Sequence, residues 1–387
     1  MRALIVEQGW SRGALAATRA LAAGGWHVGV ATDAHRGLSL ASRHCRHRHR
    51  IRPLHPVGDF VDSVAEAVKD GGYDVVFGAG EAEVLALSAA RDAVPAIVPY
   101  APHDVVVRAL DKEALMRAAA GVGIAVPDVV DPDTIADETT PVVVKARMHA
   151  RPDLPDSPPR IDTNVIVGRS AVHRRVAQIR AAGGDPQVQA FHEGRLIAYA
   201  AVRGPAGVVA RSHQQASRIW PPGAGASCRA VTVVGNPEFT ARCDALLAAL
   251  DWFGLVELQF LLGADGVPRL IDLNGRFYGS LSLAVAAGAN LPAVWADLAV
   301  GREPARPLRA RPGVRYQWGA ADLRRACRER RRGLLLDLAG TAGYGIGAVH
   351  SVAVARDPGP AVARLDDAVQ NLRRRRDRTG QRSPVGI

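Results

Sequence analysis

The first hundred residues alternate between short apolar runs and longer amphipathic segments. A short apolar run ending at a glycine or an acid is typical of a buried strand, whereas longer segments closed by glycine are typical of helices. The expected strands are "RALIVEQG", "HVGVATD", "DVVFGAG" and "AIVPY", and the expected helices are "GALAATRALAAGG", "DFVDSVAEAVKDGG" and "EAEVLALSAARDA". This alternation predicts a parallel sheet with helices on both faces. The first turn, "GWSRG", lacks a GxGxxG pattern, so we expect a scaffold without a dinucleotide of its own.

The pattern changes at Asp111. The stretch "DKEALMRAAAGVGIAVPDV" predicts a helix that begins at an acid and ends in glycines, and "PVVVKARMHA" predicts a strand that ends near Lys145. The proline-rich segment 151–160 predicts a loop. A strand and a helix at 164–184 follow, then two strands around the Glu193-Gly194 turn.

Polar residues interrupt two apolar strands in "VELQFLLGADGVPRLIDLNGRFYGS", residues 256–280. Asp272 and Asn274 are two apart and therefore share a strand face, and a neighbouring strand can bring Glu257 beside them. Carboxylate and amide oxygens on one face suit Mg²⁺, which completes its octahedron with water and phosphate oxygens. Arg276 extends the same face and suits a phosphoryl or acyl-phosphate oxygen. The alternative is a structural ion pair of Arg276 with one of the two acids.

The net charge of +11 is concentrated in three basic runs. They are "RHCRHRHRIR" at 43–52, "RRACRERRR" at 324–332 and "RRRRDR" at 373–378. Basic surfaces gather phosphates, but these runs lack the interleaved aromatic residues of single-strand binders. We interpret them as solvated faces or contacts to an anionic small molecule, with DNA or RNA as the alternative. We interpret the histidine-rich run as a solvated turn rather than a metal site.

Composition excludes several further classes of protein and of site. The four cysteines have no paired spacing, so neither a disulfide framework nor a zinc site is expected. No apolar run is long enough to span a membrane and no signal peptide is visible, so we expect a cytoplasmic protein without a membrane partner. Lysine is rare: Lys69, Lys112 and Lys145 are the only three. A chain that otherwise uses arginine and keeps lysine at a position suggests a need for a compact charge there.

These elements, in this order, resemble the ATP-grasp superfamily, closest to its carboxylate–amine ligase and carbamoyl-phosphate-synthase-like branch. The resemblance rests on "DKEALMRAAAGVGIAVP", "VVVKA", "VQAFHEG", "GLVELQFLLGADGVPRLIDLNGRFYGS" and "AAGANLP". It implies an α/β fold, with α+β character in the ATP-grasp part. The implied domains are a Rossmann-like domain at 1–110, a two-lobed ATP-grasp domain at 111–310 with its lid at about 125–190, and a basic C-terminal region at 311–387.

The resemblance also implies roles for individual residues. Phosphate contacts are expected from Lys112 and Lys145; nucleotide contacts from Gln189, Ala190, Phe191 and Glu193; metal ligation from Glu257, Asp272 and Asn274; and catalysis from Arg276 and Lys145. Two departures stand out. Ala190 occupies a position where relatives usually have an acid, so Glu193 is a candidate for that contact. The loop after Lys145 lacks the usual glycines, so it is expected to meet phosphate through the side chains of Arg147, His149 and Arg151.

The implied reaction uses ATP and Mg²⁺, or alternatively Mn²⁺, to activate a small carboxylic acid as an acyl-phosphate with release of ADP. An amine then displaces phosphate. The alternatives are bicarbonate activation, as in carboxylases and carbamoyl-phosphate enzymes, and a degenerate nucleotide-binding module with a basic partner-binding tail. A homodimer is an expectation from the family. Candidate substrate residues, most of them in the expected loop 211–227, are His213, Arg218, Ser227 and Ser280.

Overall fold

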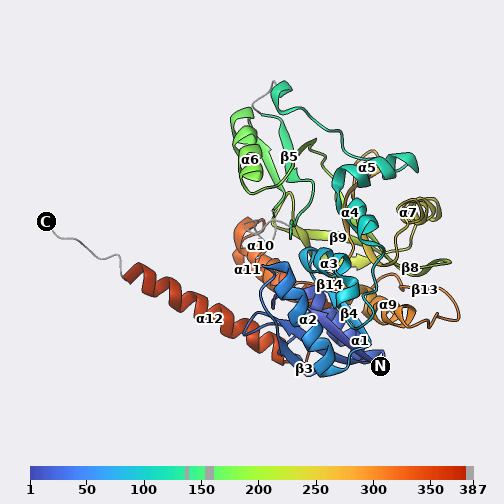
Figure 1. The fold of residues 1–387 in the computed structure, drawn as a ribbon. Coiled ribbons are helices and arrows are strands. Elements are labelled where there is room, and N and C mark those ends of the chain that lie inside the picture. Colours follow the sequence, from blue (N-terminus) through green and yellow to red (C-terminus); the bar gives the residue numbers. More distant parts are fainter. Residues whose placement is uncertain (136–138, 153–160, 381–387) are drawn as a thin grey trace.

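The computed structural model describes residues 1–135, 139–152 and 161–380, and their backbone forms three sheets. The mixed architecture confirms the predicted fold class, with an α/β sheet at the N-terminus followed by a two-lobed α+β part (Figure 1). The proline-rich loop predicted at 151–160 lies mostly outside the described residues.

The N-terminal sheet is parallel and has the order β3-β2-β1-β4. Its strands are β1 (Arg2–Val6), β2 (His27–Thr32), β3 (Cys45–Arg50) and β4 (Val75–Gly78). The helices of this part are α1 (Arg12–Ala23), α2 (Val57–Gly71), α3 (Glu81–Ala89), α4 (His103–Leu110) and α5 (Lys112–Gly121), with the short 3₁₀ turn η1 (Arg91–Ala93). Nearly continuous burial of β1, β2 and β4 explains their apolar sequences, because helices cover both faces of a parallel sheet.

Two local expectations in this region were wrong. Residues 45–50 of the histidine-rich run are the edge strand β3, which pairs with β2, rather than a solvated turn. Their side chains are mostly exposed, so no apolar periodicity signals the strand. The run "AIVPY" forms only an isolated bridge from Ile97 to Val75 instead of a full strand.

A small antiparallel sheet with the order β6-β5-β7 forms the first lobe of the following part. Its elements are η2 (Pro132–Thr134), β5 (Pro141–Ala146), β6 (Asn164–Val167), α6 (Arg169–Ala181) and β7 (Pro186–Ala190). It has its own small core, in which Val144, Val172 and Ile179 are fully buried. The lobe stands above the rest of the molecule, at the end opposite the N-terminal sheet (Figure 1).

The large sheet follows the order β12-β11-β8-β9-β10-β14-β15, with β13 against β9. Its strands are β8 (Arg195–Gly204), β9 (Gly207–Trp220), β10 (Ala226–Thr232), β11 (Gly254–Leu262), β12 (Pro268–Asn274), β13 (Leu308–Arg309), β14 (Arg315–Gln317) and β15 (Val349–His350). The helices are α7 (Pro237–Ala249), α8 (Leu281–Ala286), α9 (Leu291–Ala299), α10 (Gly319–Glu329), α11 (Leu334–Gly345) and α12 (Gly359–Gly380). Strands β14 and β15 show that the C-terminal region contributes to this sheet.

The loop expected at 211–227 is instead largely strand. Residues 207–220 form β9, which pairs with β8 on one side and with β10 on the other. Only residues 221–225 connect β9 to β10. The alternation of buried and intermediate positions from Ala210 to Ala216 is the period of a strand between two neighbours.

A shared core joins the N-terminal sheet to the large sheet. The Trp295 ring packs against Phe77 and Phe277, at centroid distances of 4.6 and 5.6 Å, and its Nε1 donates to the Pro99 carbonyl at 2.9 Å. A Cβ atom on Gly13 would lie 2.3 Å from the Phe277 carbonyl oxygen, so only glycine permits this approach of α1 to the loop after β12. The core therefore fixes the first turn of the chain beside the residues that follow Arg276.

The C-terminal helix α12 extends away from the rest of the molecule (Figure 1). Its first turns contact the N-terminal part, where Arg364 lies over the Trp10 ring at 5.3 Å. Among the described residues, none of the helices combines the length and apolarity needed to cross a bilayer.

Candidate active site

Strands β11 and β12 present four polar side chains on one face. Their antiparallel register pairs Glu257 with Asn274 and Gln259 with Asp272. Residues two apart on a strand share a face, so the four side chains lie together. The sequence placed three of them on one face, and Gln259 follows from the same rule.

Glu257 is the buried centre of this face, with a side chain only 2% exposed. Its Oε2 accepts hydrogen bonds from Gln259 Nε2 at 2.9 Å and from Asn274 Nδ2 at 3.1 Å, and its Oε1 accepts one from Gln214 Nε2 at 3.1 Å. Burial raises the pKa of Glu257 to about 7. Arg276 Nη2 donates to Asn274 Oδ1 at 2.8 Å, which places the guanidinium at the end of the polar row.

Two buried lysines converge on Asp272 from other elements. Lys112 begins α5, where the Asp111 side chain caps the helix, and its Nζ lies 3.9 Å from Asp272 Oδ1. Lys145 is the last residue but one of β5, and its Nζ donates to the Ile271 carbonyl at 3.1 Å. Burial, together with the nearby charge of Lys112, lowers the pKa of Lys145 to about 7. Burial favours the neutral form of Asp272, but Lys112, His149 and Lys145 together hold the pKa of its carboxyl well below the usual range.

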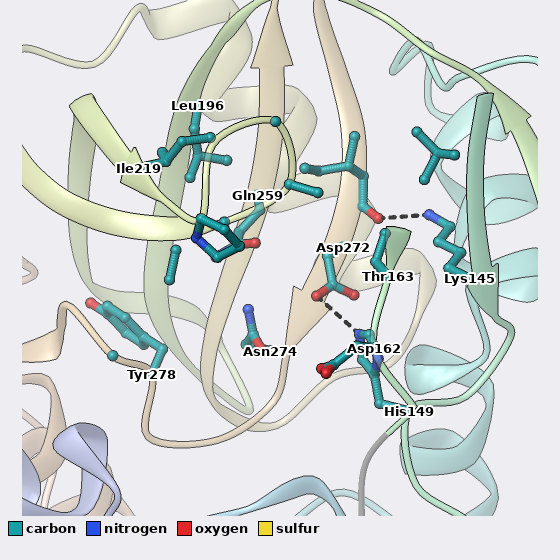
Figure 2. Close-up of a pocket in the computed structure, with 18 of the residues that line it drawn as sticks. Lys145, His149, Asp162, Thr163, Leu196, Ile219, Gln259, Asp272, Asn274 and Tyr278 are labelled. Atoms are coloured by element: carbon teal, nitrogen blue, oxygen red, sulfur yellow. Dashed lines mark hydrogen bonds and ion pairs between the residues drawn. The ribbon is translucent and has the colours of Figure 1, made fainter. Parts of the chain in front are cut away.

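His149 connects the loop after β5 to strand β12, to Ile161 and to helix α3. Its Nε2 lies 3.6 Å from Asp272 Oδ2, and its Nδ1 lies 3.1 Å from the Ile161 carbonyl oxygen. Its backbone N–H donates to Glu81 Oε1 at 3.0 Å, so a residue of α3 anchors the loop. Figure 2 shows Asp272 between Lys145 and His149, with Asn274 further along the same strand.

These groups line a cleft of about 730 Å³ between the small sheet, the large sheet and the first turn of the chain. Apolar side chains line one part of it, and the charged cluster lines another (Figure 2). The apolar lining includes Val143, Phe191, Leu196, Ile219, Leu261 and Ile271, and the polar lining includes Lys112, Lys145, His149, Gln189, Glu257, Gln259, Asp272, Asn274 and Arg276. A cleft of this size with an apolar wall and convergent polar groups suits a small-molecule ligand.

The lining fits a nucleotide and a divalent cation. Gln189 Nε2 and His192 Nε2 are buried and have no hydrogen-bond partner in the described part of the chain, and both residues line the cleft. A purine base can satisfy such groups. The carboxylates of Glu257 and Asp272, with the amide of Asn274, are hard oxygen donors of the kind that Mg²⁺ prefers.

The chain matches the model of a family described as "ATP-grasp in the biosynthetic pathway with Ter operon" over residues 208–321. The match runs from β9 to the start of α10 and therefore includes the polar face of β11 and β12. This part of the chain, less than half of its length, is therefore similar to an ATP-grasp family. A search of the curated proteins gave no match.

Solved structures share the ATP-grasp fold with this chain at low sequence identity. L-amino acid ligase from Bacillus licheniformis is 14% identical, with a TM-score of 0.59 over 78% of this chain and 74% of its own. Biotin carboxylase from Campylobacter jejuni is 13% identical, with a TM-score of 0.60 over 81% and 74%. N5-carboxyaminoimidazole ribonucleotide synthetase, in its ADP complex, is 12% identical, with a TM-score of 0.61 over 86% and 85%. At these identities the likeness shows the fold alone.

Most of the residues that the sequence singled out meet in this cleft. Those that line it are Lys112, Lys145, Gln189, Ala190, Phe191, Glu257, Asp272, Asn274 and Arg276. Glu193 lies outside this lining and is exposed. The structure therefore does not bring it to the place where a nucleotide contact was expected.

The expected substrate residues lie outside the lining of the cleft. Arg218 donates to Asp322 Oδ1 at 2.8 Å and belongs to a buried ion-pair network. His213 packs against the Tyr199 ring, with its Nε2 3.1 Å from Thr240 Oγ1. Ser227 is buried on β10 outside the cleft lining. Ser280 also lies outside the lining, but Gln214 Nε2 donates to its Oγ at 2.8 Å and links it to Glu257.

The side chains of the loop after Lys145 lie in different places. His149 lines the cleft as expected. Arg147 turns away from it, because its Nη2 pairs with Asp111 Oδ2 at 2.5 Å and its Nη1 with Glu113 Oε2 at 2.9 Å. Arg151 Nη1 donates to the Gly183 carbonyl at 3.4 Å. The part of this loop at 153–160 lies outside the described residues.

Sequence reasoning missed contributions from the first turn of the chain. Trp10, Ser11 and Arg12, in the "GWSRG" turn, line the cleft. Arg12 is held there by the Gly279 carbonyl at 3.2 Å and by Tyr316 Oη at 2.7 Å. No local pattern gives this information, because both partners are more than 260 residues away in the sequence.

Proposed function

We propose that this protein is an ATP-dependent, ADP-forming ligase that activates a carboxylate as an acyl-phosphate and couples it to an amine. The observation that carries the proposal is the convergence of Lys112, Lys145, Asp272 and Arg276 in one cleft. Buried cations beside a carboxylate-rich face suit a triphosphate and its divalent cation. The ATP-grasp fold supports the same reaction class.

The chemistry needs no covalent nucleophile from the protein. A carboxylate oxygen of the substrate attacks the γ-phosphorus, the bond to the β,γ-bridging oxygen breaks, and ADP leaves. The amine nitrogen then attacks the acyl carbon, the bond to phosphate oxygen breaks, and the nitrogen loses a proton. Lys145 and Arg276 neutralise the charge that develops on the phosphoryl oxygens, which is the main contribution a protein makes to phosphoryl transfer.

Glu257, Asp272 and Asn274 would hold the divalent cation, Mg²⁺ or Mn²⁺, whose positive charge neutralises phosphate oxygens when it is bound. Lys112 and Lys145 position the phosphates, and Gln189 with Phe191 contacts the base. The small sheet lines one side of the cleft and would help to exclude water, which would otherwise hydrolyse an acyl-phosphate. We also propose that the chain has three parts, at residues 1–110, 111–310 and 311–387. We propose that it forms a homodimer.

The direct test is ADP release from ATP with panels of carboxylic acids and amines. A second assay replaces the amine by hydroxylamine, which traps an acyl-phosphate as a hydroxamate. We expect ADP release that depends on an organic acid, and a hydroxamate of that acid. ADP release that depends on bicarbonate alone would favour carboxylation, and salt-sensitive nucleic-acid binding without ADP release would favour a degenerate module.

A further inference from the structure

A second cavity, of about 360 Å³, adjoins the cleft at the carboxyl ends of β1 and β4. We call it the acidic pocket. Its lining is Glu7, Gln8, Trp10, Ser11, Ala79, Gly80, Glu81, Ala82, Glu83, His149, Ala150 and Arg276. Trp10, Ser11, His149 and Arg276 also line the cleft, so the two cavities meet beside Arg276.

The pocket lies where the strand order of the N-terminal sheet reverses. The chain leaves β1 to form β2 and β3 on one side, and then returns to form β4 on the other side of β1. In open parallel sheets, ligands bind in the crevice outside the carboxyl ends of the strands at such a reversal. This domain therefore offers a ligand site although its first turn lacks a dinucleotide motif.

Two buried carboxyl groups line the pocket without full partners. Glu7 directly follows β1, Glu83 lies in the first turn of α3, and their side chains are 2% and 3% exposed. Glu7 Oε1 and Glu83 Oε2 are without a hydrogen-bond partner in the described part of the chain. Burial raises the pKa of each carboxyl to about 7. The charge of Arg276, which also lines the pocket, lowers the pKa of Glu83, but burial has the larger effect at both carboxyls. A buried carboxylate with an unpaired oxygen is costly, so a further bound cation would stabilise the pair.

The chemistry of the pocket favours an ammonium group over a metal ion. Among the described residues, no three His, Cys, Asp or Glu side chains are grouped to hold a metal. A primary ammonium has three N–H donors, which match carboxyl oxygens that lack donors. Gly80 leaves room for this arrangement, because a Cβ atom there would lie 2.1 Å from Glu83 Oε2.

We propose that the acidic pocket binds the primary ammonium group of the amine substrate between the carboxylates of Glu7 and Glu83. This inference rests on the proposed ligase function. Arg276, on the wall shared with the cleft, would hold the activated acid at the other end, so the amine is delivered to the acyl carbon from the N-terminal side. Before attack, one N–H bond breaks, its proton passes to a carboxylate oxygen, and the electron pair stays on nitrogen.

The first test needs neither ATP nor an acid. Titration of the full-length protein with n-butylammonium chloride at pH 8 is followed by calorimetry and by the melting temperature. We expect binding and a higher melting temperature for the wild type, and an affinity lower by about tenfold or more for Glu7→Gln and Glu83→Gln. Glutamine keeps the shape and removes the charge, so both variants are expected to fold.

Three controls isolate the charge and the site. n-Butanol has the same alkyl chain without the charge, sodium chloride matches the ionic strength, and Glu66→Gln removes an exposed carboxylate of α2. The wild type and Glu66→Gln should bind butylammonium equally. Any of three results would overturn the inference. Butanol could stabilise the wild type as much as butylammonium does, or butylammonium could fail to bind the wild type. The variant that combines Glu7→Gln with Glu83→Gln could also bind butylammonium with unchanged affinity.

A second measurement separates the pocket from the proposed reaction. With any amine that supports ADP release, Glu83→Gln should raise KM for the amine by about tenfold or more and leave KM for ATP unchanged. Butylammonium binding without ADP release for any acid and amine would refute the ligase function and leave the ammonium site standing. ADP release with an unchanged amine KM would refute the site and leave the ligase.

Discussion

Lys112 Nζ lies 3.9 Å from Asp272 Oδ1, and the lysine side chain is only 2% exposed. Lys145 is close enough to both residues for its charge to interact with them. Two buried lysine side chains thus face one partly exposed carboxylate at this corner of the cleft. Buried charges without balanced partners are costly, so the corner is suited to a polyanion that arrives with its own cation.

Removal of one of these lysines should disable ATP turnover. In Lys145→Ala, the phosphates lose a donor that the surrounding structure holds in place. We expect ADP release, measured as kcat/KM for ATP, to fall by about a hundredfold or more, as for removal of other preorganised donors.

The chain provides a matched control in Lys69, an exposed residue in the last turn of α2. Lys69→Ala should leave both ADP release and the melting temperature close to those of the wild type. Equal, small effects of Lys145→Ala and Lys69→Ala would count against the phosphate assignment.

The metal assignment is tested by Asp272→Asn combined with Asn274→Ala. This variant loses one carboxylate and one amide oxygen from the face of β12. The Mg²⁺ concentration that gives half-maximal ADP release should rise by about tenfold or more, because each ligand contributes to affinity. Asp265→Asn, in the exposed turn between β11 and β12, is the control and should keep the wild-type Mg²⁺ dependence. An unchanged Mg²⁺ dependence in the double variant would show that the cation binds elsewhere.

The polar face of β11 and β12 could be predicted from the sequence because a strand has a fixed period. Asp272 and Asn274 are two residues apart, so their common face follows from geometry without knowledge of the rest of the fold. The resemblance to the ATP-grasp superfamily singled out Lys112 and Lys145 among the three lysines, and the rarity of lysine in an arginine-rich chain supported that choice. Strand geometry and the resemblance together therefore indicated the residues that meet at the centre of the cleft.

Other features depend on partners that are distant in sequence. Strand β3 has no buried face of its own, so its sequence carries no strand period. From the sequence, Arg218 was a candidate substrate residue, but in the structure it pairs with Asp322 of α10. The acidic pocket combines the ends of β1 and β4 with Arg276. Each of these features depends on contacts between segments that are distant in sequence, and no short sequence pattern predicts such contacts.

Arg218→Ala should therefore destabilise the protein without changing substrate affinity. Asp322 has no exposed side-chain surface and is paired with Arg218 at 2.8 Å and Arg229 at 2.6 Å. Loss of one partner leaves a buried carboxylate oxygen without its ion pair, at a cost of about 2 kcal/mol in the free energy of unfolding. Urea denaturation measures this change. Arg242→Ala, which removes an exposed pair with Glu238, should cost less than about 1 kcal/mol. A raised KM with unchanged stability in Arg218→Ala would restore the substrate interpretation.

The acidic pocket also predicts a pH dependence of stability. Burial raises the pKa of Glu7 and of Glu83 from 4.5 to about 7, so between these values the folded state holds more protons than the unfolded state. Their contribution to stability is complete below pH 4.5 and is lost as the pH rises through 7. The loss is on the order of 3 kcal/mol for each carboxyl.

Urea denaturation at pH 5 and pH 8 of the wild type and of Glu7→Gln combined with Glu83→Gln isolates this contribution. Glutamine does not titrate, so the double variant should lose less unfolding free energy between the two pH values and should be the more stable protein at pH 8. The other ionisable groups are common to both proteins and cancel in the comparison. Equal losses of unfolding free energy would mean that the two carboxyl groups have hydrogen-bond or ion-pair partners in solution. The acidic pocket would then not be stabilised by a bound cation. A smaller loss in the double variant would mean that the wild type keeps two destabilising acids, which a structural role does not explain and an ammonium ligand does.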